Sequence, residues 1–531
     1  MKSINKILSL AALLIACTSC SDSWDDHYEA VTPGSEQTLW QKISANSNLS
    51  DFSSILSNTY VYRQHKKSSV SYADLLNSGQ AFTVWAPQNG TFNKDSLLAL
   101  CQTAVGDSCV EKMFIKNHIA RSTFSLVQDS DDITFMNTKH LTFSSGKIGD
   151  IAITSANNRA KNGILHVINK ELPYQYNIYE ALVNMNQFKS MGDFLRGFEK
   201  DSLDEENSLS SGLVEGIPVY IDSVLIEKNT MLDGFGYINS EDSSYLMVAP
   251  SAAGFTEAYD SVARYFNYAY VNKADSLQRY WTYRALMDDG FFNMNIQTSP
   301  KDSLVSTAYN VRKWKDHVFY KPFADGGILN LATNRIACSN GTLYLTDKWP
   351  FKYKDTFFKE ITMEAEREAN ITNYSSCNYN VRYLSADSIS NHSYIDIVAS
   401  PATSNWTVTY NIENTLAGTY DICAVILPNK VYNTVKPDTR PNKFKATLKY
   451  YDVKGKQQTY NCGNVAFTNN VNKVDTIVLA KAFKFPTCNY KQDKTTVTLT
   501  LTCSILARES STYLRETFLD CIYLKPISEQ K

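Results

Sequence analysis

The amino-acid sequence predicts an α+β protein in which two tandem α/β modules precede an all-β sandwich. Its 531 residues, 43% hydrophobic and 12% aromatic, suffice for three or four domains with packed cores. Two strand-and-turn segments in the first part of the chain both recur later, and the distance from first to second copy is nearly the same for both segments. After Glu360 the helical periodicity gives way to short alternating or apolar runs, which are typical of strands.

The charge of the chain argues against a nucleic-acid partner, and its sequence contains none of the catalytic motifs that were sought. With 52 Lys+Arg and 54 Asp+Glu, the formal net charge of −2 supplies no positive field for phosphates. The 7 histidines are isolated, and the sequence contains no CxxC pair, GxSxG elbow, HExxH helix or glycine-rich nucleotide loop. We therefore expect no enzymatic activity, no cofactor and no metal site.

The first residues have the layout of an export signal. Lys2 and Lys6 precede an apolar run from Ile7 to Ala16, which is too short to span a bilayer. The segment Leu14-Ile15-Ala16-Cys17-Thr18-Ser19-Cys20 resembles a bacterial lipobox. We expect residues 1–19 to be a lipoprotein signal peptide and Cys20 to carry the lipid, with Cys17 as the alternative.

The acidic segment that follows, residues 20–34, is predicted to be a tether to the first folded module. Its Ser21-Asp22-Ser23-Trp24-Asp25-Asp26 run resembles the surface-export signal of Bacteroidota lipoproteins. This resemblance implies a palmitate-bearing anchor in a bacterial outer membrane, with the protein facing the cell exterior.

A three-residue pattern of Asp, then Ser or Thr, then a small or aliphatic residue resembles the O-glycosylation sequon of Bacteroidota. It occurs eight times, where this composition predicts roughly two. Asp-Ser pairs also occur at helix caps and turns for capping reasons. The candidate sites are Ser96, Ser202, Ser223, Ser261, Ser276, Ser303, Ser388 and Thr476.

Residues 35–175 form the first predicted module. Thr38–Ile43 and Leu49–Leu56 have helical spacing, and Ala81–Pro87 is a buried strand closed by a proline. Cys101 and Cys109 are close enough in sequence to form a disulfide. The other cysteines lie in apolar runs and are expected to be small buried hydrophobic residues.

Two segments of this module carry a family resemblance. Phe82-Thr83-Val84-Trp85-Ala86-Pro87-Gln88-Asn89 resembles the first signature of fasciclin-type adhesion domains, and Asn162-Gly163-Ile164-Leu165-His166-Val167-Ile168-Asn169 is similar to their closing signature. His118 occupies the place of the family's Tyr-His helix, with Asn117 instead of the tyrosine. The resemblance implies adhesion to matrix or glycan and makes His118 the candidate adhesion residue.

The same order returns in residues 176–360, the second predicted module. Tyr245–Pro250 and Cys338–Pro350 resemble the two signatures, 163 residues (249 − 86) and 178 residues (340 − 162) after the first copies. A repeat this long indicates a duplicated domain rather than a solenoid. Tyr344 stands where the first module has His166, so an adhesive role that rests on this histidine does not transfer.

Residues 361–531 are predicted to form a sandwich. Its seven strands are expected at Tyr394–Val398, Trp406–Ile412, Gly418–Leu427, Phe444–Tyr451, Val474–Leu479, Thr495–Cys503 and Phe518–Leu524. The layout resembles jelly-roll carbohydrate-binding modules. Tyr374, Tyr394 and Trp406 are the candidate sugar-binding platform, and packing in the core of the sandwich is the alternative for each.

The carboxylate clusters Asp288-Asp289, Glu364-Glu366-Glu368 and Asp204-Glu205-Glu206 are interpreted as solvated surface. Together these features favour a non-catalytic surface lipoprotein that captures glycan or peptide. The family resemblance implies that it works beside a TonB-dependent transporter and its lid lipoprotein. An adhesin for host matrix or neighbouring cells is the alternative, and a hydrolase with an unrecognised site is the second.

Overall fold

The computed structural model describes residues 36–63, 66–125, 131–144, 146–214, 217–308, 317–431, 434–493 and 496–527. Cys17, Cys20 and the tether lie outside these residues. The described residues divide into two compact units. The first contains the residues up to Tyr176 together with Asp201–Lys228. The second contains Asn177–Lys200 and the residues from Asn229 onward. We name residues 36–176 module 1, residues 177–360 module 2 and residues 361–527 the sandwich. In these described ranges, no helix is long and apolar enough to cross a membrane.

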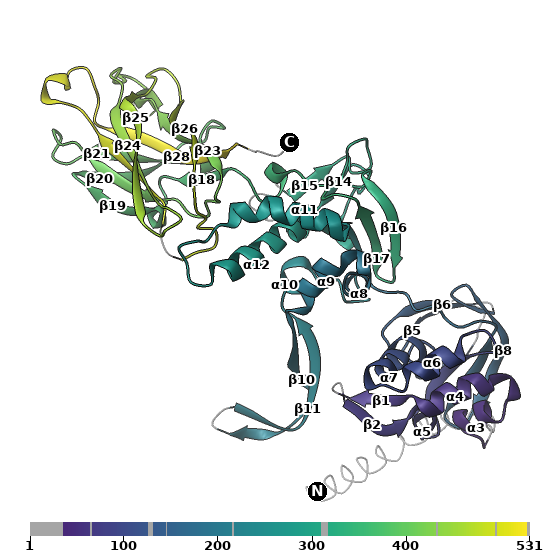
Figure 1. Cartoon of the computed structure of the whole chain (residues 1–531). Coiled ribbons are helices and arrows are strands. Elements are labelled where there is room, and N and C mark those ends of the chain that lie inside the picture. The colour runs from purple at the N-terminus through teal and green to yellow at the C-terminus, as the bar shows by residue number, and fades with distance from the viewer. Residues whose placement is uncertain are drawn as a thin grey trace, which may run out of the picture. The chain divides into compact units, whose positions relative to one another are not determined.

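Module 1, whose strands β5, β6 and β8 are labelled in Figure 1, is built on a seven-stranded sheet with the order β4-β3-β9-β8-β7-β6-β5. Its central strand β3 pairs in parallel with β9, and all six β3 residues are buried. Val84 packs with the helices, whereas Trp85 points into a second core on the other face of the sheet. The strands are β1 Tyr60–Arg63, β2 Lys66–Ser71, β3 Phe82–Pro87, β4 Ile119–Arg121, β5 Asp131–Thr134, β6 His140–Ser144, β7 Lys147–Ile148, β8 Ile151–Ala160 and β9 Gly163–Ile168.

The helices of module 1 begin where the sequence offers side-chain caps. The Thr38 hydroxyl caps the first helix and Gln41 completes the capping box, while Ser71 and Asp74 make the same arrangement at another helix. The helices are α3 Leu39–Ser44, α4 Ser50–Asn58, α5 Tyr72–Leu76, α6 Lys94–Leu100 and α7 Ala104–Val110, and a π-helical turn covers Glu111–Ile115.

Module 2 repeats the central part of this arrangement. Its four-stranded sheet has the order β13-β12-β17-β16, which matches β4-β3-β9-β8, and β12 again pairs in parallel with β17. Tyr245 lies opposite Gly341 as Phe82 lies opposite Gly163. The strands are β10 Glu199–Val214, β11 Ile217–Asn229, β12 Tyr245–Pro250, β13 Phe291–Asn293, β14 Ser303–Val305, β15 Val318–Tyr320, β16 Ala332–Cys338 and β17 Gly341–Thr346; the helices are α8 Ile178–Asn184, α9 Lys189–Arg196, α10 Leu232–Phe235, α11 Ala252–Val262 and α12 Ala274–Met287.

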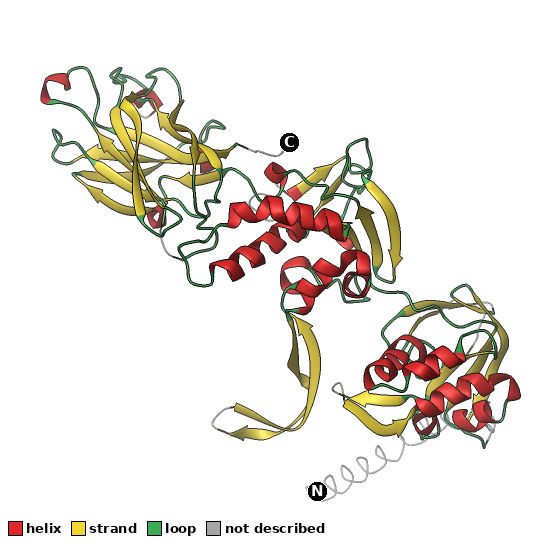
Figure 2. Ribbon diagram, in the orientation of Figure 1, coloured by secondary structure: helices red, strands yellow, loops and turns green. Residues whose placement is uncertain are grey.

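The sandwich consists of a six-stranded and a five-stranded antiparallel sheet, with only short helical turns (Figure 2). A strand is found at each of the seven predicted positions. The first sheet has the order β20-β21-β28-β23-β26 with β18 also paired to β28, and the second β19-β22-β27-β24-β25. The strands are β18 Ile361–Glu364, β19 Ile371–Ser375, β20 Cys377–Tyr383, β21 Ser393–Ala399, β22 Thr407–Asn411, β23 Thr419–Leu427, β24 Lys443–Tyr451, β25 Gln457–Thr468, β26 Asp475–Lys484, β27 Thr498–Cys503 and β28 Thr517–Pro526.

Module 2 and the sandwich are joined by tyrosine hydrogen bonds and aromatic contacts. The Tyr268 and Tyr270 hydroxyls, which follow α11, donate to the carbonyls of Tyr490 and Cys488, both at 2.8 Å. Phe358 lies between the two parts, with ring centroids 4.8 Å from Tyr265 and 5.1 Å from Tyr420. These hydroxyls and rings are taken out of water together, and module 2 without Asp201–Lys228 belongs to the same compact unit as the sandwich.

One possibility that the sequence left open does not occur, and one expectation is wrong. The bridge that the sequence allows between Cys101 and Cys109 is not formed: Cys101 is buried, 3.5 Å from the Thr59 hydroxyl, and Cys109 is exposed. The carboxylate clusters are not all solvated surface, because Asp289 is only 4% exposed. It lies at the end of α12, where folding of module 2 brings distant partners to it. The buried-cysteine interpretation is confirmed, as for Cys423 and Cys503.

Candidate functional site

His118, the candidate adhesion residue, is fully buried and is a structural residue. Its Nδ1–H donates to the Phe114 carbonyl at 2.7 Å, and the Leu172 N–H donates to its Nε2 at 2.9 Å. Burial lowers the pKa of His118 to about 4, so the ring is neutral at physiological pH. Since it has no exposed surface, the expectation that His118 contacts a ligand is wrong.

The three aromatic residues proposed as a sugar platform do not form one. Trp406 is 1% exposed and its Nε1–H donates to the Arg515 carbonyl at 2.6 Å, while Tyr394 is 3% exposed against Phe518. Tyr374 alone is exposed, and it makes an edge contact with Tyr379. Tyr394 lies on β21 and Trp406 directly precedes β22, and both side chains are in the core, which is the alternative that the sequence left open.

The candidate O-glycosylation residues differ in accessibility. Ser96, Ser276, Ser388 and Thr476 are exposed, whereas Ser202, Ser261 and Ser303 are partly buried. The side chain of Ser223 lies outside the described residues. The four exposed positions are open to solvent, and glycosylation stays a prediction.

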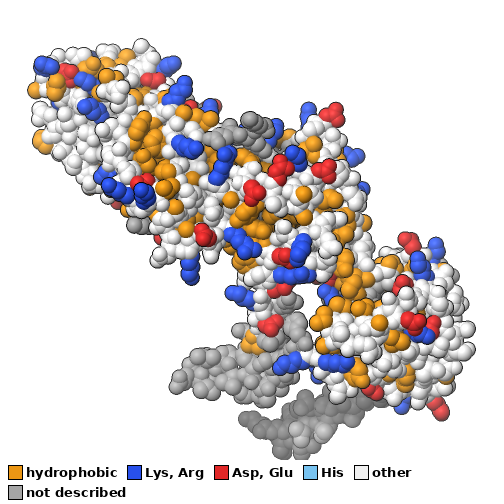
Figure 3. Space-filling model, in the orientation of Figure 1, with side chains coloured by type: hydrophobic (Ala, Val, Ile, Leu, Met, Phe, Trp, Pro, Cys, Tyr) orange, Lys and Arg blue, Asp and Glu red, His pale blue; other side chains and the backbone are white. Residues whose placement is uncertain are grey.

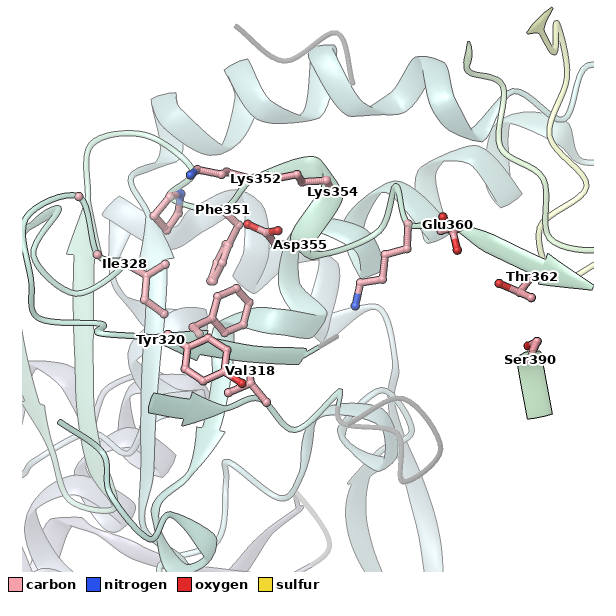
Figure 4. Close-up of a pocket in the computed structure, with 15 residues that line it drawn as sticks. Val318, Tyr320, Ile328, Phe351, Lys352, Lys354, Asp355, Glu360, Thr362 and Ser390 are labelled. Atoms are coloured by element: carbon pink, nitrogen blue, oxygen red, sulfur yellow. The ribbon is translucent and has the colours of Figure 1, made fainter. Parts of the chain in front are cut away.

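An open groove of about 890 Å³ runs from module 2 to the start of the sandwich. Tyr320, Ile328 and Phe351 gather at one end of it, and Glu360, Thr362 and Ser390 lie at the other (Figure 4). The antiparallel pair β14–β15 places Tyr320 there, with 64% of its surface exposed. An aromatic ring this accessible offers a flat apolar surface for stacking. We call this feature the groove.

Charged side chains line the groove between its two ends. Lys352, Lys354 and Lys359 contribute ammonium groups, and Asp355 and Glu360 contribute carboxylates. Over the face seen in Figure 3, basic and acidic side chains are interspersed, with no broad patch of one sign. The groove therefore combines one exposed ring with donors and acceptors of both charges.

A smaller pocket of about 270 Å³ lies next to the groove, and we call it the junction pocket. His317 lines the pocket, and the following residue Val318 lines the groove. Lys359, which lines the groove, has its Nζ 3.2 Å from both ring nitrogens of His317. The His317–Lys359 contact therefore joins a residue that lines the junction pocket to one that lines the groove.

Two carboxylates line the junction pocket. Asp288 accepts a hydrogen bond from Arg284 Nε at 2.6 Å, and Asp289 accepts from Ser306 Oγ at 2.7 Å and His317 Nδ1 at 2.9 Å. Burial raises the pKa of Asp288 to about 6, although the positive charge of Arg284 acts in the opposite direction and favours the ionised carboxylate. Sequence reasoning missed this site because only the fold brings α12, residue 317 and the segment around Tyr490 together.

A second acidic cluster lies in the sandwich beside the groove. Both Asp520 oxygens accept from the Ser390 N–H at 3.1 Å, and the Ser390 hydroxyl donates to Glu364 at 2.7 Å. Burial raises the pKa of Asp520 to about 7, and the carboxylates of Glu364 and Glu366 add to the effect. Among the residues that the structure describes, no group of three or more His, Cys, Asp or Glu is arranged to hold a metal ion.

Comparisons with solved structures give matches at low identity. A FAS1 domain pair from the insect cell adhesion molecule fasciclin I is 11% identical, covers 60% of this chain and 97% of its own, and has a TM-score of 0.18. A Paenibacillus xanthan lyase is 15% identical over 36% of this chain and 16% of its own, with a TM-score of 0.23. The CBM22-1 xylan-binding domain from Paenibacillus barcinonensis is 11% identical over 33% of this chain and 96% of its own, with a TM-score of 0.21.

The chain spans 16%, 27% and 19% of the length of the first three solved structures that it matches. No curated protein sequence matches it. The fasciclin domain model matches residues 54–173, which run from the middle of α4 to just beyond β9 and include both segments that carried the resemblance. Residues 54–173 form a fasciclin domain.

Proposed function

We propose that this chain is a non-catalytic surface protein that captures glycan in the groove. The observation that carries the proposal is the exposed Tyr320 ring beside a row of lysines and acidic residues in one open hollow. A sugar ring presents an apolar face that stacks on tyrosine, and its hydroxyls both donate and accept hydrogen bonds. Lysine ammonium groups donate to those hydroxyls, and the carboxylates of Asp355 and Glu360 accept from them.

Binding of the full mature chain to glycan and peptide arrays tests this function, followed by calorimetry with the best polymer. Tyr320→Ala is expected to weaken binding at least tenfold without changing the melting temperature, because the ring is exposed. The matched control is Tyr383→Ala, which removes a tyrosine that is 83% exposed and lies on β20 outside the groove. Equal losses in both variants would contradict the proposal. A peptide hit would change the ligand class, and shortening of the bound glycan would favour a hydrolase.

We also propose that the protein is anchored by lipid in an outer membrane and works with a nutrient importer. The lipobox-like segment before Cys20 and the acidic run after it support the location. Affinity purification from detergent-solubilised outer membranes, with mass spectrometry of the partners, is the test. A TonB-dependent transporter with its lid lipoprotein is the expected result. Recovery of the protein alone, with loss of cell attachment when it is deleted, would favour the adhesin.

We further infer that module 2 is a diverged second fasciclin-like domain and that the sandwich is of the jelly-roll type. The shared strand order and the shared parallel register of β3–β9 and β12–β17 support the first inference. The two antiparallel sheets of the sandwich support the second. If module 2 is such a domain, its Tyr344 replaces the buried His166 by register, with Val248 in place of Trp85.

A further inference from the structure

The junction pocket is assembled from three parts of the chain and has no role in the function proposed for the groove. Trp281 comes from α12, Phe357 from the connection to the sandwich, and Tyr490 from the segment between β26 and β27. With about 270 Å³, the pocket is slightly smaller than the range of about 300–1,000 Å³ that is typical of small-molecule sites. It is therefore suited to a single small ligand rather than to a polymer.

Aromatic rings form two adjoining walls of the pocket. The rings of Trp281 and Tyr490 meet edge to face, with centroids 5.1 Å apart and planes at 88°. Such an arrangement presents two perpendicular apolar surfaces that meet in a corner. Both residues are only partly buried, so part of each ring remains open for contact. A flat ligand with one apolar face fits against a wall of this kind.

The carboxylates of Asp288 and Asp289 offer hydrogen-bond acceptors to this pocket. Their Oδ1 atoms are occupied, as described above, by Arg284, Ser306 and His317. Among the described residues, the Oδ2 atoms of Asp288 and Asp289 accept no hydrogen bond. The partners at Oδ1 fix the orientation of each carboxylate, so the second oxygen is held ready to accept from a ligand hydroxyl.

The charge balance of the pocket selects between ligand classes. Among the described lining residues, Asp288 and Asp289 supply two negative charges, and Arg284 and Lys491 supply two positive charges. Among these described residues, neither sign of charge is in excess. A neutral molecule with several hydroxyl groups satisfies the carboxylate oxygens as acceptors and the Lys491 ammonium group as donor without disturbing this balance.

We propose that the junction pocket binds one neutral sugar ring, stacked on Trp281 or Tyr490 and hydrogen-bonded through its hydroxyls to Asp288 and Asp289. The pocket is a site separate from the groove, and the proposal does not depend on what the groove binds.

Calorimetric titration of the full mature chain with a panel of neutral hexoses and pentoses tests the proposal. At least one sugar is expected to bind, and Trp281→Ala is expected to reduce its affinity at least tenfold. Asp288→Asn keeps the shape of the side chain but weakens the acceptor, so an intermediate loss of several-fold is expected. Because Trp281→Ala removes packing, the melting temperature of each variant is measured, and Asp288→Asn remains informative if Trp281→Ala does not fold.

Tyr320→Ala is the matched control, since it changes the groove and leaves the pocket intact. Unchanged sugar binding in this variant, with loss of polymer binding, would show that the two sites are separate. The proposal is overturned if no neutral sugar binds, or if Asp288→Asn and a folded Trp281→Ala both bind as the parent does. Binding of methylammonium or acetate in preference to every sugar would also overturn it, since either result contradicts the charge argument.

Discussion

The side chains of Asn162 and Asn340 make the same three hydrogen bonds in module 1 and module 2. Each amide oxygen accepts the first backbone N–H of a helix, and each amide nitrogen donates to two carbonyls in the segment before the central parallel strand. For Asn162 the partners are Leu39 N, Leu76 O and Ser78 O at 2.8, 2.9 and 2.7 Å; for Asn340 they are Ile178 N, Ile238 O and Ser240 O at 2.9, 2.8 and 2.8 Å. In each module, this asparagine therefore links the start of the first helix to the segment that leads into the parallel strand pair.

Asn340→Ala is expected to destabilise the unit that contains module 2 by roughly 2–4 kcal/mol, because buried partners lose three hydrogen bonds at once. Urea unfolding of the parent and the variant measures the change. Asn334→Ala is the control, since Asn334 is exposed and its side-chain oxygen accepts from the neighbouring Arg335 N–H. A loss below about 0.5 kcal/mol in Asn340→Ala would contradict the structural role.

The glycine after Asn162 is required by space rather than by a turn alone. A Cβ on Gly163 would lie 1.8 Å from the Phe82 carbonyl oxygen, and one on Gly341 would lie 1.8 Å from that of Tyr245. Gly163→Ala is therefore expected to prevent module 1 from folding, as judged by its melting transition. Gly79→Ala is the matched control, because a Cβ there has no heavy atom within 4 Å. Similar melting temperatures of both variants would show that β3 and β9 can move apart with little loss of stability.

Alternating hydrophobic patterns made the central strands of the sandwich predictable, and the same principle explains what the sequence did not reveal. β19 and β25 are exposed edge strands, so few apolar side chains mark them. The junction pocket escaped notice for another reason. Trp281 and Tyr490 are separated by 209 residues (490 − 281), and their contact depends on how module 2 packs against the sandwich.

Trp406→Ala is expected to affect stability rather than ligand binding. Its ring is among the largest fully buried side chains, and deleting it removes packing and the hydrogen bond to the Arg515 carbonyl. A loss of roughly 3–5 kcal/mol is typical of such a truncation. Thermal unfolding measures this loss, and Trp406→Phe is expected to lose less stability than Trp406→Ala. Reduced glycan binding with an unchanged melting temperature would revive the surface-platform interpretation.

His118 makes module 1 sensitive to acid. The unfolded chain protonates this histidine near pH 6.5, whereas burial keeps the folded pKa at about 4. Stability is therefore lost as the pH falls from about 6.5 towards 4, and the expected loss between pH 8 and pH 5 is about 2 kcal/mol. Chemical unfolding at both pH values measures this, and His118→Gln is expected to lose this part of the pH dependence. The same slope in both proteins would contradict the assignment.

Asp520 produces the opposite pH dependence in the sandwich. Burial beside Glu364 and Glu366 raises its folded pKa to about 7, while the unfolded carboxyl titrates near 3.8. The folded state therefore keeps a proton that the unfolded state has released, and this contribution is present at low pH and lost as the pH rises through 7. Between pH 8 and pH 5 the sandwich is expected to gain about 2–3 kcal/mol from this residue.

Asp520→Asn tests this effect, because the amide carries no charge at any of these pH values and still accepts from the Ser390 N–H. The variant is expected to lose the gain on acidification and to unfold at higher urea than the parent at pH 8. Asp475→Asn serves as a control on β26, since that carboxylate is only partly buried and accepts from the Asn470 N–H. If acidification stabilises Asp520→Asn as much as the parent, the ionisation of another group is responsible.

Opposite shifts in the unfolding of module 1 and the sandwich between pH 8 and pH 5 would distinguish the effects of His118 and Asp520 in one experiment.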